Sequence, residues 1–213
     1  LATGSDGGGS IRIPSGVCGM SSFKPTQGRI PAGPAPLGAA DLSTVGPMAQ
    51  RIRDVALALD VVVGPDANDL RSLPALDGSF RSACDAPEAP TRLLWCTSID
   101  GSPVDDEVNE ITQAAIARIR AAGVEVIETD PIMPDVMKPF LLLFYGNMVP
   151  GYRHLIGTPA FDEITPGLQT LIAGAEKRLS VDAVERARKA AQALSVRLGA
   201  AMKGFDALIT PMT

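Results

Sequence analysis

The residues of this chain that are best suited to chemistry lie in the run GSDGGGSIRIP, at positions 4–14. Three consecutive glycines, Gly7, Gly8 and Gly9, allow positive φ angles and let a ligand approach without obstruction by a Cβ atom. Successive N–H groups in such a turn can bind an anion. Because Ser10 follows at once, an oxyanion formed by attack of its hydroxyl would lie among these donors. The pattern is compatible with acyl transfer, with a phosphate-binding loop and with a simple turn.

Spacing argues against three better-known glycine motifs. The dinucleotide-binding fingerprint requires a preceding strand, which the sequence does not indicate, and the P-loop requires a Gly-Lys-Ser/Thr ending, which is absent. The nucleophile elbow Gly-x-Ser-x-Gly also fails, because Arg12 occupies the position of its second glycine. Asp6 and Arg12 flank the glycines with opposite charges, and we expect them to brace the loop.

A nucleophilic serine needs a base, and the chain offers few candidates. His154 is its only histidine, and its Tyr-Arg-His-Leu setting is more typical of a surface or structural residue than of a triad. A lysine with a lowered pKa is the alternative base, but Pro25 indicates a structural turn at Lys24. Thiol chemistry at Cys18 is a further alternative, although the absence of a suggestively spaced histidine or acid favours a buried free cysteine.

Hydrophobic periodicity predicts the elements that position these residues. Residues 4–47 are rich in Gly, Pro and Ser and indicate an ordered loop with short helical pieces. Helices are expected over 51–63, from Ser102-Pro103 to Gly123, over 134–148 and over 180–203, and strands over 92–96, 124–128 and 206–210.

The segment 92–128 predicts a right-handed βαβ unit with parallel strands, and the helix at 134–148 is apolar on nearly all sides, which predicts burial. The fold class is therefore α/β, a mixed, largely parallel β-sheet core covered by helices.

Composition limits the class of function. A formal net charge of -5 without a basic stripe argues against a nucleic acid bound directly through its phosphates. Cys18, Cys84 and Cys96 are too few and too scattered for a disulfide framework or a zinc site, so we expect reduced thiols in a cytoplasmic protein. No apolar run reaches transmembrane length, and no membrane partner is expected. The chain starts with Leu1 instead of Met, and the dense glycine motif begins as early as Gly4, so we expect a fragment whose residues 1–10 are poorly anchored.

The stretches GSDGGGSIRIPSGVCG, FKPTQGRIP and VGPMAQRIRDVALALDVVVGPD are similar to the amidase-signature family over nearly all of the first 66 residues. The segment 92–128 and the final FDALITPMT resemble the family more loosely. That family uses a Ser-cis-Ser-Lys triad. The resemblance implies that Ser10 is the acyl-ester nucleophile, with an oxyanion hole at Gly7, Gly8 and Gly9. The bridging cis-serine and the base lysine normally lie upstream of this motif, outside this sequence.

The resemblance also implies one amidase-signature domain over residues 1–213, incomplete at its N-terminus and at its C-terminus. It predicts a bacterial, cytoplasmic hydrolase that converts a small linear amide, or an ester, into an acid and ammonia or an amine, without a metal or organic cofactor. A homodimer is one expected assembly, and the fragment alone is expected to be inactive. Two alternatives stay open, namely a protein similar to the amidotransferase subunit that releases ammonia for transfer-RNA-dependent transamidation, and a non-catalytic amidase-like fragment. Phe140, Phe144 and Tyr145 line the substrate pocket or, more simply, pack in the core.

Overall fold

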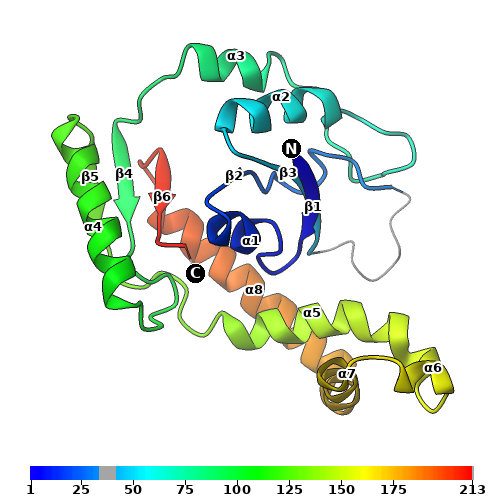
Figure 1. The fold of residues 1–213 in the computed structure, drawn as a ribbon. Coiled ribbons are helices and arrows are strands. Elements are labelled where there is room, and N and C mark those ends of the chain that lie inside the picture. The colour runs from blue at the N-terminus through cyan, green and yellow to red at the C-terminus, as the bar shows by residue number, and fades with distance from the viewer. Residues whose placement is uncertain (34–41, 213) are drawn as a thin grey trace. The chain divides into compact units, whose positions relative to one another are not determined.

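The computed structural model describes residues 1–33 and 42–212 (Figure 1). These residues divide into two compact units. The first unit contains Leu1–Glu88, Gly146–Ile172 and Met212, and the second contains Ala89–Tyr145 and Ala173–Pro211. Each unit has its own three-stranded sheet. The assignment of residues 1–213 to one domain stays a prediction.

The first unit is built on an antiparallel sheet in the strand order β1-β3-β2. β1 (Ala2–Asp6) pairs along its whole length with β3 (Thr44–Ala49), so that Asp6 lies opposite Thr44. The short strand β2 (Ser21–Ser22) pairs with β3 as well. A strand therefore leads directly into the glycine run.

This sheet corrects two expectations about the N-terminal region. Residues 1–10 are not poorly anchored, because β1 is paired with β3, and the predicted loop over 4–47 contains most of three strands. A six-residue helix in the same segment agrees with the short helical pieces expected there. The part of that loop at 34–41 lies outside the described residues. Gly46 and Pro47 concealed β3, since glycine and proline normally argue against a strand interior. Here a Cβ at Gly46 would collide with the Phe23 carbonyl, and the Phe23 N–H donates to the Pro47 carbonyl at 3.1 Å.

Two helices complete the N-terminal part of this unit. α2 (Ile52–Val62) confirms the helix predicted at 51–63. Its inward side chains join the sheet and the segment before it in one cluster of buried residues, Ile30, Ala49, Val55 and Leu59. No element was predicted where α3 (Phe80–Asp85) lies. Its start is fixed from α2, because Asp60 accepts from the Ser79 hydroxyl at 2.6 Å and from the Phe80 N–H at 2.7 Å.

The helix predicted at 134–148 begins and ends later, as α5 (Met137–Tyr152). Its side chains from Phe140 to Met148 are half-buried, so the predicted full burial is wrong for the described residues. The boundary between the units falls within α5, after Tyr145, and neither core encloses the whole helix. Shorter helical elements follow, namely η1 (Arg153–Leu155), α6 (Pro159–Asp162) and α7 (Pro166–Arg178).

The second unit contains the predicted parallel sheet, in the order β5-β4-β6. β4 (Arg92–Trp95) pairs in parallel with β5 (Glu125–Glu128) on one side and with β6 (Ala207–Ile209) on the other. α4 (Asp106–Ala121) connects β4 to β5, which confirms the βαβ unit. α8 (Val181–Ala201) confirms the helix predicted at 180–203.

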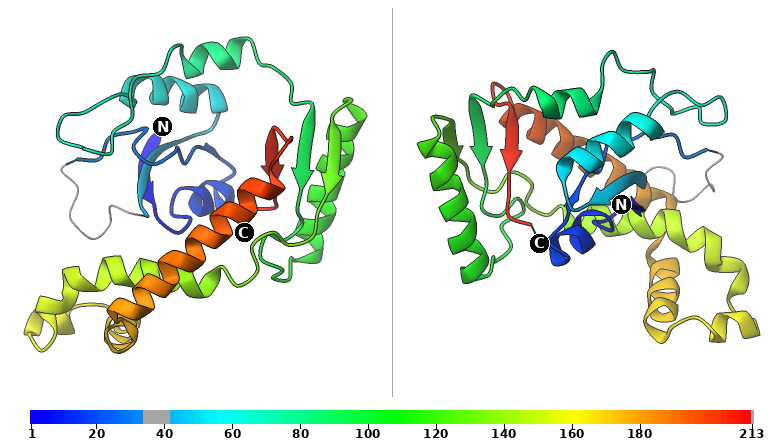
Figure 2. Two further views of the ribbon diagram at one scale, coloured as in Figure 1. Left: turned by 180° about the vertical axis from the view of Figure 1, so that it is seen from behind. Right: turned by 45° about the horizontal axis from the view of Figure 1, so that its top comes forward.

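Successive residues of β4 point to opposite faces of this sheet, and each face has its own helix (Figures 1 and 2). Leu93 and Trp95 pack against Ile116 of α4. Leu94 and the following Cys96 belong to the cluster that includes α8. The α/β class with helices on a parallel sheet is thus confirmed.

Helix ends in this unit follow side-chain chemistry. α4 is capped by Asp105, which accepts from the Glu107 N–H at 2.9 Å, so the predicted start at Ser102 is wrong. Gly123 has φ +91°, as expected for a residue that ends a helix.

No helix in the described part of the chain combines the length and the apolar character needed to cross a membrane.

Candidate active site

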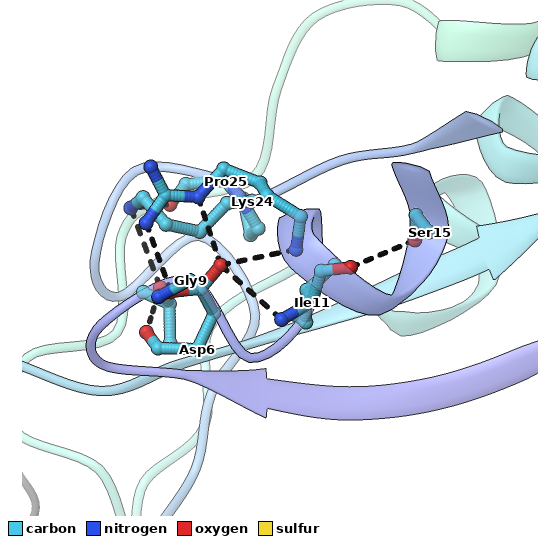
Figure 3. A network of polar contacts seen from close by, with 8 residues as sticks. Asp6, Gly9, Ile11, Ser15, Lys24 and Pro25 are labelled. Carbon is cyan, nitrogen blue, oxygen red and sulfur yellow. Dashed lines mark hydrogen bonds and ion pairs between the residues drawn. The ribbon is translucent and has the colours of Figure 1, made fainter. Parts of the chain in front are cut away.

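The site is organised by Asp6, whose side chain is fully buried at the end of β1 (Figure 3). Its Oδ1 accepts from the Gly9 N–H at 2.6 Å, and its Oδ2 accepts from the N–H groups of Ile11 and Arg12 at 3.3 and 3.4 Å. The Arg12 guanidinium adds two contacts, Nε to Oδ2 at 2.8 Å and Nη2 to Oδ1 at 2.9 Å. One carboxylate therefore closes the turn that carries Ser10.

These contacts also set the charge of the pair. Hydrogen bonding from Arg12, helped by the Gly9 N–H, holds the pKa of the Asp6 carboxyl well below its usual value, although burial alone would raise it. The bond to Asp6 raises the pKa of Arg12. Asp6 is consequently ionised at neutral pH, and its charge is paired with that of Arg12, whose side chain is half-exposed.

Gly9 is the residue that the turn requires to be glycine. Its φ of +111° lies in the left-handed region, and a Cβ there would come within 2.6 Å of the Ile13 side chain. Its carbonyl accepts at 2.7 Å from the N–H of Ile13, the second residue of α1 (Arg12–Val17). Because the Gly9 N–H is already bonded to Asp6, the observed geometry does not favour Gly9 as an oxyanion donor.

Ser10 is exposed, and its hydroxyl has no polar contact with the described residues. Within residues 1–33 and 42–212, the N–H groups of Gly7, Gly8 and Ser10 likewise have no hydrogen-bond acceptor. The loop fixed by Asp6 thus carries an exposed hydroxyl and, next to it in the sequence, three N–H groups without an acceptor among the described residues. The Ser10 N–H is a donor that the sequence pattern did not single out.

Two further polar residues lie beside this loop. Lys24, labelled in Figure 3, donates from Nζ to the Pro25 carbonyl at 3.1 Å. It also donates to Thr44 Oγ1 at 3.4 Å. Partial burial, and then the positive charge of Arg12, lower the pKa of Lys24. Thr44 is buried in β3, and its hydroxyl donates to the Asp6 carbonyl at 3.5 Å. No sequence signal marked Thr44, because its role depends on the strand pairing that Gly46 and Pro47 concealed.

The other candidate residues lie outside this network. Cys18 is exposed, so its predicted burial is wrong: it caps the C-terminal end of the short helix α1, whose buried residue is Ser15. His154 is exposed in η1 and has no contact with Asp6 or Ser10 among the described residues.

The aromatic residues of α5 contact one another within the second unit. The Phe140 and Phe144 ring centroids are 5.6 Å apart, and those of Phe144 and Tyr145 are 5.9 Å apart. These contacts agree with plain packing as well as with a pocket wall.

The model of the Amidase family matches residues 1–213, and the chain belongs to this family. It is 33% identical over 152 residues to an acylamidase of Rhodococcus erythropolis, covering 71% of this chain and 31% of that protein. It is 36% identical over 145 residues to a glutamyl-tRNA(Gln) amidotransferase subunit of Thermus thermophilus, covering 67% of this chain and 30% of that protein.

Among solved structures, a bacterial aryl acylamidase belonging to the amidase-signature enzymes resembles this chain with a TM-score of 0.86 and 24% sequence identity. The likeness covers 99% of this chain and 45% of that protein, and it establishes the amidase-signature fold. The chain spans less than a third of the two curated relatives.

Proposed function

We propose that this chain is the nucleophile-bearing part of an amidase that hydrolyses a carboxylic amide through an acyl-serine intermediate. The observation that carries the proposal is the turn at Asp6. It holds Ser10 exposed and leaves the N–H groups of Gly7, Gly8 and Ser10 without acceptors among the described residues.

In the proposed reaction, the Ser10 hydroxyl attacks the amide carbonyl and gives its proton to a base. The oxyanion is stabilised by backbone N–H groups that need no reorganisation during the reaction. The C–N bond then breaks, the nitrogen leaves with a proton as ammonia or an amine, and water cleaves the acyl ester to release the acid. Esters would react by the same steps, with an alcohol as the leaving group.

The base is proposed to be a lysine that acts through a cis-serine, both supplied by residues outside these 213. An unactivated serine hydroxyl is a weak nucleophile at neutral pH, so the chain alone is proposed to be inactive. The Asp6–Arg12 pair, in this proposal, braces the loop and takes no part in proton transfer.

A second candidate is an amidotransferase component, favoured by the identity of 36% to the glutamyl-tRNA(Gln) amidotransferase subunit of Thermus thermophilus. Such a protein would release ammonia and would act with partner subunits. The acylamidase reading, by contrast, requires only a small amide and is compatible with a homodimer. The free cysteines, Cys18, Cys84 and Cys96, favour a cytoplasmic location for either protein.

Covalent labelling tests the nucleophile directly. The full-length parent should react with a fluorophosphonate, and mass spectrometry of the digest should place the adduct on Ser10. Exposed Cys18 is the internal alternative, because it lies on the same short segment. An adduct on Cys18 with Ser10 unmodified would replace the serine mechanism by a thiol mechanism.

His154→Ala is expected to leave kcat/KM within about twofold of the parent, because the exposed imidazole has no described contact with the Ser10 turn. Removal of a true general base would cost roughly 10² to 10⁴ in rate. Steady-state kinetics on a simple amide decides between the two values. A loss on the order of a thousandfold would restore the histidine triad as the mechanism.

A further inference from the structure

Thr44 has a buried hydroxyl that the proposed mechanism does not use. The residue is 6% exposed and lies opposite Asp6 in the pairing of β1 with β3. Its Oγ1 is 3.5 Å from the Asp6 carbonyl oxygen and 3.4 Å from Lys24 Nζ. Both contacts are long, so each is weak alone, but together they join a cation on one segment to the peptide that opens the glycine run.

Donor and acceptor chemistry fixes the direction of this chain of contacts. Lys24 has three N–H donors and no acceptor, so Thr44 Oγ1 must accept from it. The single proton of the Thr44 hydroxyl is then left for the Asp6 carbonyl, which can only accept. A second Lys24 donor is bonded to the Pro25 carbonyl at 3.1 Å, which holds the ammonium in place.

The Asp6 carbonyl shares its peptide unit with the Gly7 N–H. This unit is planar, and in the trans form its C=O and N–H point in opposite directions. The pairing of Asp6 with Thr44 already turns the Asp6 carbonyl toward β3, and the Thr44 hydroxyl adds a second donor on that side. The Gly7 N–H therefore points away from β3. Polarisation along a chain of hydrogen bonds also strengthens the N–H as a donor.

We propose that Lys24 and Thr44 are positioning residues of the oxyanion hole, which orient the Asp6–Gly7 peptide so that the Gly7 N–H points toward the oxyanion. The inference rests on the proposed acyl-serine function. Neither residue takes up the Ser10 proton in this proposal. Lys24 acts on the oxyanion only through Thr44 and the backbone.

The test uses the full-length parent and the variants Thr44→Val, Lys24→Met and Lys24→Arg. Active sites are first counted with a fluorophosphonate, and kcat is then expressed per titrated serine. Expressing kcat in this way distinguishes a lower rate at each active site from a smaller number of folded molecules. Thr44→Val and Lys24→Met should each lower kcat by about five- to tenfold, with KM within about twofold, since a misdirected donor costs less than a deleted one.

Two further results are expected if the residues act as one chain. The double variant should lose no more than about the larger single loss, because the two changes interrupt the same contacts. Lys24→Arg should recover at least half of the parent kcat, since a guanidinium also donates without accepting. The matched controls are Lys189→Met and Thr170→Val, both exposed on helices of the C-terminal half, which should leave kcat unchanged.

The inference is overturned if Thr44→Val or Lys24→Met has parent kcat per titrated serine, if the two losses multiply, or if Lys24→Arg is no better than Lys24→Met. The Ser10→Ala variant tells this failure from failure of the proposed function. If Ser10→Ala still turns over, the acyl-serine mechanism itself is wrong. If Ser10→Ala is inactive while the Lys24 and Thr44 variants are normal, only the positioning role is wrong.

Discussion

Ser10→Ala in the full-length parent is expected to abolish amide hydrolysis, with a loss in kcat on the order of the 10⁶ measured when the nucleophile of subtilisin is removed. Stability should change by less than about 0.5 kcal/mol, because the Ser10 side chain is exposed and has no polar contact with the described residues. The hydroxyl therefore contributes chemistry and little packing.

Ser15→Ala is the matched control for this experiment. Its hydroxyl is buried and donates to the Ile11 carbonyl at 2.7 Å, so its removal should cost about 1 kcal/mol of folding free energy. Activity per folded molecule should stay near that of the parent. Kinetics and urea unfolding on both variants, with the isolated 213-residue chain as a third sample, complete the comparison. Parent-like turnover by Ser10→Ala, or Ser10-dependent turnover by the isolated chain, would contradict the assignment.

Asp6→Ala is expected to destabilise the protein by about 3 kcal/mol and to lower kcat by at least about a hundredfold. The value is at the low end for a broken buried ion pair, because water can solvate the half-exposed Arg12. Catalysis should fall more than stability requires, since the Gly9 N–H loses its acceptor and the turn under Ser10 loses its geometry.

Asp69→Ala separates these two effects. Asp69 is also buried, and it accepts from the Ala32 N–H at 2.9 Å and the Arg71 N–H at 3.0 Å, without contact to Asp6 or Ser10 among the described residues. It should lose stability while retaining kcat per folded molecule. If Asp69→Ala and Asp6→Ala lowered kcat equally at matched folded fractions, the specific bracing role of Asp6 would be disproved.

The dependence of stability on acid pH tests separately whether the Asp6 charge stabilises the fold. Because the folded pKa of Asp6 lies below the unfolded value of 3.8, its stabilisation is complete above about pH 5 and is lost as the pH falls through 3.8 toward the folded pKa. Asp6→Asn cannot titrate, so the stability difference between parent and variant should shrink steadily between about pH 5 and pH 3. A constant difference over that interval would show that the Asp6 charge does not support the fold.

The elements that could be read from the sequence are those with a strong hydrophobic period. β4, α4, β5, α8 and β6 were predicted because their apolar residues recur at strand or helix spacing. The strand β3 was missed because Gly46 and Pro47 locally favour a loop, and only the pairing with β1 outweighs that preference.

The site divides in the same way. Ser10, Asp6 and Arg12 lie within one short motif, so their association could be read from sequence. Thr44 could not, because it is 38 residues from Asp6 and reaches the site only through the sheet. The hydrogen bond from the Gly9 N–H to Asp6 could not be predicted either, because the sequence shows which groups can donate but not which acceptors they contact.

The pairing of β1 with β3 also bears on the order of events during folding. The bonds from Gly9 and Arg12 to Asp6 span only three and six residues, whereas the contact from Thr44 to Asp6 closes a segment of 38 residues. Closing a long segment costs entropy before its contacts repay it, so distant strand pairing is slow compared with a local turn. A chain emerging from the ribosome can thus form the serine turn early, but that turn remains hydrated until β3 has been synthesised and has paired. We therefore expect Asp6 to become buried only after the local turn has formed, and a truncated chain that ends before residue 44 would carry the whole motif without a buried Asp6.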